Sequence, residues 1–152
     1  MIHKDTPLKD ILKLAAPCMC RSCSHGCKLG SGFLAGDDSK NMAKFLEISE
    51  EELKSNYLEE AVMFNKRMLR PRLLRKEKMP FGRCVFYSDE FGCTVHEAKP
   101  LQCKTSMGCK DYGEELSIWF MMNYILEPKD YRSMEEFRQY VKCGGRLIPE
   151  LK

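Results

Sequence analysis

Apolar residues recur at helical spacing in the first part of the chain, and the residues around them predict where two helices begin and end. Thr6 and Pro7 form an N-cap and first-turn pair, after which apolar residues return on one face as far as Ala15. Pro17 ends this first predicted helix. A second helix is expected over about 38–46.

The sharpest start signal for a helix lies at Ser49, which forms a capping box with Glu52. Ile48 and Leu53 stand where a hydrophobic staple would close around that box. The pattern predicts a third helix that continues to about Asn65 and buries one apolar stripe in the core.

Two further helices are predicted in the C-terminal part of the chain. The segment 114–126 is strongly apolar, and a helix that is apolar on nearly all sides is most simply the central packing element. Ser133 and Glu136 form another capping box, which predicts a last helix through about Val141. The glycines at 144–145 end that helix.

Short strands are predicted in the middle of the chain. The segment 66–78 carries seven basic residues and one acid, which indicates a solvated face, and Pro71 favours an extended or edge strand there. Segments 83–87 and 93–96 have the composition of two short strands, and the turn-forming residues 88–92 join them into a hairpin.

These elements predict an α+β fold that is mainly helical, with a short β-hairpin and Cys-rich loops. The small, polar segment 18–36 contains four glycines and is expected to be one such loop. A chain of 152 residues has the usual size of one domain, and 43% hydrophobic residues suffice for one core. We therefore expect residues 1–152 to form a small single domain.

The charge of the chain narrows its partners only a little. Lys and Arg number 25 and Asp and Glu number 22, which leaves a net charge of +3. This surplus is too small to indicate nucleic acid as the main partner. No apolar stretch approaches the roughly 20 residues of a membrane helix, and the N-terminal apolar run is too short for a secretory signal. We expect a cytoplasmic protein without a membrane span.

Cysteine is the most informative residue type, because eight of the nine cysteines fall into two groups of four and only Cys143 is left over. The groups are Cys18, Cys20, Cys23 and Cys27, and then Cys84, Cys93, Cys103 and Cys109. Four thiolates complete either a tetrahedral zinc site or an iron–sulfur cluster such as 4Fe–4S. In a reducing cytoplasm such thiols favour metal binding over disulfides. We predict all eight as metal ligands in the Cys-rich loops.

Other thiol chemistries fit the spacing less well. Ferredoxins use a CxxCxxCxxxCP run, whereas this chain has CxCxxCxxxC without the proline. A thioredoxin-like site would need one isolated CxxC at a strand-to-helix junction, not four crowded thiols. His25 and His96 lie among the cysteines, but with eight thiols at hand they are interpreted as neighbours of the metal or surface residues.

The spacing leaves the number of sites open. The second group is spaced by nine, ten and six residues, which suits ligands presented by a hairpin and the loop beyond it. Each group could hold its own metal, or cysteines from both groups could complete one site. If the groups mix, some of the eight are buried structural cysteines instead.

Two blocks of residues resemble a known family. Cys20-Arg-Ser-Cys23-Ser-His-Gly26-Cys27 forms the first block. The second contains Cys84-Val-Phe-Tyr, Gly92-Cys93-Thr-Val-His-Glu and Lys99-Pro100-Leu-Gln-Cys103-Lys. Together they resemble the CxxCxxCC cysteine-cluster family, the YkgJ-like group described as zinc- or iron-chelating. The third cysteine of the family motif falls on Gly26 here, and Cys18 is the nearest replacement.

The resemblance implies a cofactor class more clearly than a reaction. It supports six ligands, and Cys18 and Cys109 are added by the count of four per group. It also implies a distant likeness to flagellin lysine methylases, which have a related iron–sulfur region and which, with the loose spacings, favour iron–sulfur over zinc. The leading hypothesis is therefore a metal-chelating protein. An iron–sulfur-dependent, methylase-like modifying enzyme and a nucleic-acid-binding zinc module using the basic run 66–78 are the alternatives.

Overall fold

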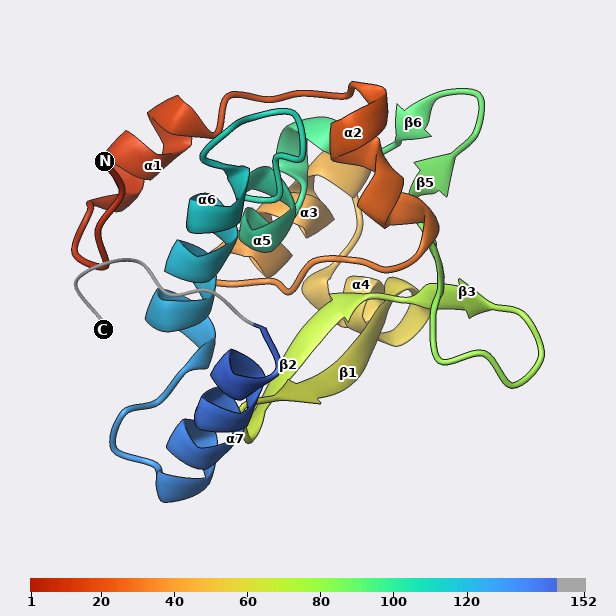
Figure 1. The fold of residues 1–152 in the computed structure, drawn as a ribbon. Coiled ribbons are helices and arrows are strands. Elements are labelled where there is room, and N and C mark those ends of the chain that lie inside the picture. The colour runs from red at the N-terminus through yellow and green to blue at the C-terminus, as the bar shows by residue number, and fades with distance from the viewer. Residues whose placement is uncertain (145–152) are drawn as a thin grey trace.

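The computed structural model describes residues 1–144 and confirms the predicted α+β, mainly helical fold (Figure 1). Seven α-helices are formed among these residues. They are α1 (Leu8–Leu14), α2 (Arg21–Ser24), α3 (Asp38–Leu46), α4 (Glu50–Tyr57), α5 (Leu101–Lys104), α6 (Gly113–Phe120) and α7 (Tyr131–Lys142). Shorter helical turns are η1 (His25–Lys28) and η2 (His96–Ala98), and a π-helical segment, η3 (Met121–Ile125), continues α6.

Six short strands in the same part of the chain form three antiparallel pairs. β1 (Leu58–Met63) pairs with β2 (Lys66–Pro71), β3 (Leu73–Arg75) pairs with β4 (Gly82–Cys84), and β5 (Tyr87–Ser88) pairs with β6 (Gly92–Cys93). No pair extends into a larger sheet among the described residues. Each pair is a separate two-stranded hairpin, and two of the pairs contain a cysteine.

The main core forms around α6 and η3, as the apolar pattern of this segment predicts. Leu116, Phe120 and Ile125 are fully buried there, and α1 contributes Ile11. The β1–β2 turn packs on α7 through Phe64, whose ring meets that of Phe137 edge to face. Figure 1 shows α7 beside this hairpin, below α6.

A second, smaller core lies among α3, α4 and the strands that follow them. Met42 and Leu53 are fully buried in it, together with Val95. Cys84 and Phe86 belong to the same cluster. The molecule therefore has two apolar centres, and each of them lies next to cysteines.

The helix predicted to run from Ser49 to about Asn65 is too long. Its start is confirmed, because the Ser49 hydroxyl accepts a 3.0 Å hydrogen bond from the Glu52 N–H. The helix ends at Tyr57, and the next residues pair as β1 with β2. Phe64 and Asn65 both have positive φ and form the tight turn between these strands, a backbone conformation that the apolar spacing could not reveal.

The predicted hairpin of 83–87 and 93–96 is correct only near its turn. Tyr87 pairs with Cys93 across residues 88–92, but Cys84 lies on β4, which pairs with β3 instead. The basic run 66–78 is mostly extended, as Pro71 predicts, and forms β2 and β3. Two separate hairpins, β3–β4 and β5–β6, therefore place Cys84 and Cys93.

The remaining sequence expectations differ at the caps and in one loop. The side chain of Asp130, not of Ser133, caps α7, and Ser133 accepts a hydrogen bond from the Glu127 N–H. Thr6 lies one residue outside the α1 N-cap, which is Pro7. The predicted loop 18–36 contains α2 and η1, and Gly145 lies outside the described residues.

Within residues 1–144, every helix is too short or too polar to cross a lipid bilayer.

Candidate metal centre

The first half of the candidate centre is built on the short helix α2. Cys20 is its extended N-cap residue and Cys23 lies within it, so the CxxC spacing places both thiols on one turn. The Ser24 hydroxyl donates to the Cys20 carbonyl at 2.9 Å and holds this turn closed. Cys18 lies in the extended segment just before the helix and packs, like Cys23, against the main core.

The fourth thiol arrives from the loop between α5 and α6. Met107 is buried in the main core and anchors this loop. Gly108 lets the loop lie against α2, since a Cβ at this position would stand 2.8 Å from the Ser22 carbonyl oxygen. This close approach brings Cys109 next to Cys23, although the two are 86 residues apart in sequence.

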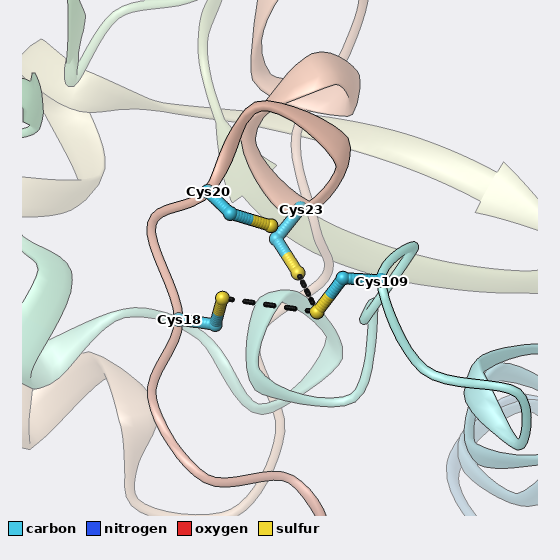
Figure 2. Close-up of side chains that lie close together, drawn as sticks. All are labelled: Cys18, Cys20, Cys23 and Cys109. Carbon is cyan, nitrogen blue, oxygen red and sulfur yellow. Dashed lines mark hydrogen bonds between the residues drawn. The ribbon is translucent and has the colours of Figure 1, made fainter.

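The four sulfur atoms converge on one point (Figure 2). All of them lie within 4.8 Å of one another. The Cys23 thiol donates to the Cys109 sulfur at 3.2 Å, and the Cys18 and Cys109 sulfurs are 3.8 Å apart. We call Cys18, Cys20, Cys23 and Cys109 the compact set.

These distances match one tetrahedral ion. Zinc–thiolate bonds of about 2.3 Å place the sulfurs of a tetrahedron about 3.8 Å apart. The compact set therefore needs only small adjustments of its side chains to enclose a single metal ion. Four thiolates also match the soft-ligand preference of zinc and of iron.

Within the compact set, Cys20 has a lowered pKa, whereas Cys23 and Cys109 have raised pKa values. The Cys23 backbone N–H, helped by the Cys18 thiol, lowers the pKa of Cys20 to about 7. The hydrogen bond from Cys23 raises the pKa of Cys109, and burial raises that of Cys23. Because a metal needs deprotonated sulfur, Cys20 is the group readiest to bind first.

The other four predicted ligands lie around a cavity of about 560 Å³ that Cys18 and Cys23 also border. We call these four the wide set: Cys27 on η1, Cys84 on β4, Cys93 on β6 and Cys103 in α5. Burial raises the pKa of Cys84 to about 11 and also raises the pKa of the other three thiols. Without a metal, these thiols stay protonated at neutral pH.

The structure thus regroups the cysteines of the two sequence groups. Cys109 joins the first three cysteines, and Cys27 joins the second group in its place. Cys143 lies exposed at the C-cap of α7, apart from both sets. The mixing that the sequence analysis left open is therefore the arrangement found, with four cysteines in each set.

Some residues around the thiols were missed by sequence reasoning. Lys99 lies near enough to Cys27 and Cys93 for its positive charge to offset part of the rise that burial causes in the pKa of both thiols. Gly32 and Gly108 allow the close approaches that place Cys103 and Cys109. Gly108 directly precedes Cys109, so its position in the sequence is a usable signal. Gly32 is far in sequence from Cys103, the cysteine that it contacts, so the sequence gives no such signal.

Neither histidine belongs to a group of converging ligand atoms among residues 1–144. His96 lines the cavity, where burial lowers its pKa and the charge of Lys99 adds to that effect. This agrees with the interpretation of His96 as a neighbour of the thiols.

Residues 19–137 match the sequence model of the CxxCxxCC family, described as "Putative zinc- or iron-chelating domain". The chain belongs to this family. No curated protein and no solved structure gives a significant match to the chain. The CxxCxxCC match and the convergence of four sulfurs together identify a metal-chelating domain.

Cys18 lies one residue before the region that matches the CxxCxxCC family. Gly26, where the family motif has its third cysteine, borders the cavity, and a Cβ there would meet no atom within 4 Å. The compact set nevertheless has four thiols, because Cys18, just before α2 in the sequence, belongs to it together with Cys109.

Proposed function

We propose that this protein chelates a single tetrahedral metal ion with its compact set and that zinc is the ion it holds. The observation that carries the proposal is the mutual spacing of four sulfurs, all within 4.8 Å. Thiolates attached to the different irons of a cluster have to stand further apart than those on one ion, so this spacing supports zinc over an iron–sulfur cluster at the compact set.

A closed shell of four thiolates supports a chelating or structural role over catalysis. Catalytic metal sites keep an open or exchangeable position, and four sulfur ligands leave none on a tetrahedral ion. The methylase-like alternative gains no support from the compact set. We propose that residues 1–152 act as one domain that the metal staples, since bound metal stabilises only the folded chain.

The nucleic-acid alternative is weakened by the partners of the basic run. Glu59 binds Arg75 at 2.7 Å and Arg70 at 3.1 Å, so two of the arginines are already neutralised in part. Clustered thiols that must stay reduced support a cytoplasmic location.

X-ray absorption at the metal edge tests the proposal directly. Protein purified under anaerobic conditions should carry about one zinc per compact set, with four sulfur neighbours at about 2.3 Å. Cys23→Ala and Cys109→Ala should each reduce the zinc content at this site, whereas Cys143→Ala, which changes an exposed cysteine apart from both sets, should leave it unchanged. Anaerobic protein without metal, or zinc bound mainly by nitrogen and oxygen, would contradict the proposal.

A further inference from the structure

Four cysteines from four separate segments border one cavity that a single ion would leave largely empty. Cys27, Cys84, Cys93 and Cys103 all contribute to its wall, and its volume is about 560 Å³. The wall also contains the apolar side chains of Phe86 and Val95. A partly apolar wall around soft ligands is a setting in which proteins hold inorganic sulfur clusters.

The four cysteines of the wide set lie in one region, but their sulfurs do not converge as those of the compact set do. All four border the same cavity, and they lie near enough to one another for the ionisation of one thiol to disfavour the ionisation of the others. Yet within residues 1–144 the only group of three or more ligand atoms that converges within 4.8 Å is the compact set. The wide set therefore surrounds a space larger than the first shell of one ion, whose sulfurs would be about 3.8 Å apart.

Backbone amides lie near three of these four sulfurs. The N–H groups of Phe86 and Tyr87 are close enough to Cys84 to lower its pKa, and that of Val95 acts on Cys93 in the same way. The Gly32 N–H has this effect on the pKa of Cys103. Hydrogen bonds to thiolate sulfur stabilise the negative charge of an iron–sulfur cluster and adjust its potential.

The backbone is shaped to admit Cys103 to the cavity. A Cβ at Gly32 would lie 2.6 Å from the Cys103 sulfur and 2.8 Å from its backbone nitrogen. The Phe33 N–H bonds to the Gln102 side chain at 2.6 Å and fixes the same approach. Two segments about 70 residues apart are thus held together at the sulfur atom itself.

We propose that the wide set is a second metal site, separate from the compact set, and that it holds an iron–sulfur cluster. Each of the four cysteines loses its thiol proton and becomes a thiolate ligand to iron. Lys99, next to Cys27 and Cys93, offsets part of the negative charge that results. The protein would then carry two different inorganic groups, one ion and one cluster, in neighbouring sites.

Reconstitution of the full chain tests this assignment. Protein without metal is incubated under argon with a thiol reductant, zinc, sulfide and equal amounts of ferrous and ferric iron. Zinc, iron and acid-labile sulfide are then counted per chain, and visible absorbance is recorded. Wild-type protein should bind zinc and, in addition, iron and sulfide. The numbers of iron and sulfide per chain should be equal.

Variants assign the two groups to their sites. Cys93→Ala and Cys103→Ala should lower iron, sulfide and visible absorbance at least tenfold while zinc stays bound. Cys23→Ala and Cys109→Ala should lose zinc while iron and sulfide stay bound. Cys143→Ala should change neither the zinc content nor the iron and sulfide content. Circular dichroism checks folding, and Cys93, which is only partly buried, provides a variant that tolerates change if Cys103→Ala unfolds.

Three results would overturn the second site. In the first, Cys93→Ala and Cys103→Ala both keep iron and sulfide. In the second, Cys109→Ala loses iron and sulfide together with zinc while its fold is intact. In the third, the wide set takes up zinc without sulfide. Loss of zinc binding alone would refute the proposed function of the compact set and leave the cluster site standing.

Discussion

The two thiol sets use the same residue type to build two different environments. Two cysteines of the compact set, Cys18 and Cys23, pack on the main core, and the other two are exposed. Two cysteines of the wide set, Cys84 and Cys93, belong to the smaller core, where Cys84 is only 7% exposed. Spacing and burial, not residue identity, therefore separate the site whose sulfurs match one ion from the site at which we propose a cluster.

The sets also differ in how folding assembles them. Three ligands of the compact set lie between positions 18 and 23, so one short segment supplies most of the site. The wide set draws on η1, β4, β6 and α5, and each segment has to be placed by its own packing. The closure of long loops costs conformational entropy, so the wide set depends more strongly on the rest of the fold.

The largest expected effect is the loss of stability when the ion leaves the compact set. Free zinc at a thousandfold excess over Kd should raise the free energy of unfolding by about 4 kcal/mol. Thermal unfolding with zinc and with a chelator measures this difference. Cys109→Ala should unfold at the same temperature in both conditions, and a zinc-dependent shift in that variant would show that the ion binds elsewhere.

A second prediction concerns Glu59, whose contacts hold the strand that pairs with the Cys84 strand. Its carboxylate binds Arg75 and Arg70 and accepts from the Leu73 N–H at 2.9 Å, and Leu73 pairs with Cys84. Glu59→Gln should cost about 2–3 kcal/mol at neutral pH and loosen the wide set, while zinc in the compact set stays bound. Denaturant unfolding and metal counts measure both effects.

The pH dependence of this effect has a defined sign. The hydrogen bond from Arg75 lowers the pKa of Glu59 to about 2, below the ordinary value of 4.5. A lowered folded pKa stabilises the protein above pH 4.5, and this stabilisation is lost as the pH falls toward about 2. Glu60→Gln is the matched control, because Glu60 is 54% exposed and pairs loosely with Arg67, so its loss should cost under about 1 kcal/mol. Equal losses in the two variants would contradict this role of Glu59.

A third prediction uses two glycines that differ in the space around them. Gly32→Ala should cost about 1–3 kcal/mol and reduce iron binding, because its Cβ would overlap Cys103. Gly30→Ala should be nearly neutral, because no atom lies within 4 Å of a Cβ there. Iron counts and thermal unfolding compare them, and similar behaviour of the two variants would remove the argument from close approach.

The smallest expected effect is at the loop that carries Cys109. Gly108→Ala should cost about 1 kcal/mol and weaken zinc binding, because the added methyl group pushes the loop away from the Ser22 carbonyl. Gly26→Ala faces open space and serves as its control. Competition with a coloured zinc chelator measures both affinities, and unchanged zinc affinity in Gly108→Ala would mean that the loop can shift freely.

The sequence allowed good prediction of those parts of the fold that depend on local pattern. The bounds of α3 agree with the prediction, and Ser49 caps α4 as its capping box indicates. The end of α4 was wrong, because the turn at Phe64 and Asn65 requires a rare backbone conformation in residues without the usual turn signature. Local spacing cannot show where such a strand pair forms.

For the candidate site, the sequence indicates cysteine as the ligand type but does not show which four cysteines lie together. Four of the eight predicted cysteines converge in the structure, and the other four line one cavity, so their role as ligands stays a prediction. Which four belong together depends on the return of the Cys109 loop to α2, a contact between residues 86 apart, and on the β3–β4 hairpin that places Cys84. Gly108 and Gly32 matter through close approaches to Ser22 and Cys103, residues far from them in sequence.

The 3.2 Å separation of the Cys23 and Cys109 sulfurs has a practical consequence for handling the protein. Two thiols this close need little movement to form a disulfide once air removes their electrons and protons. That bond would tie α2 to the neighbouring loop and withdraw two of four donors at once. Material prepared in air could therefore be well folded yet unable to take up its ion until a reductant restores the thiols.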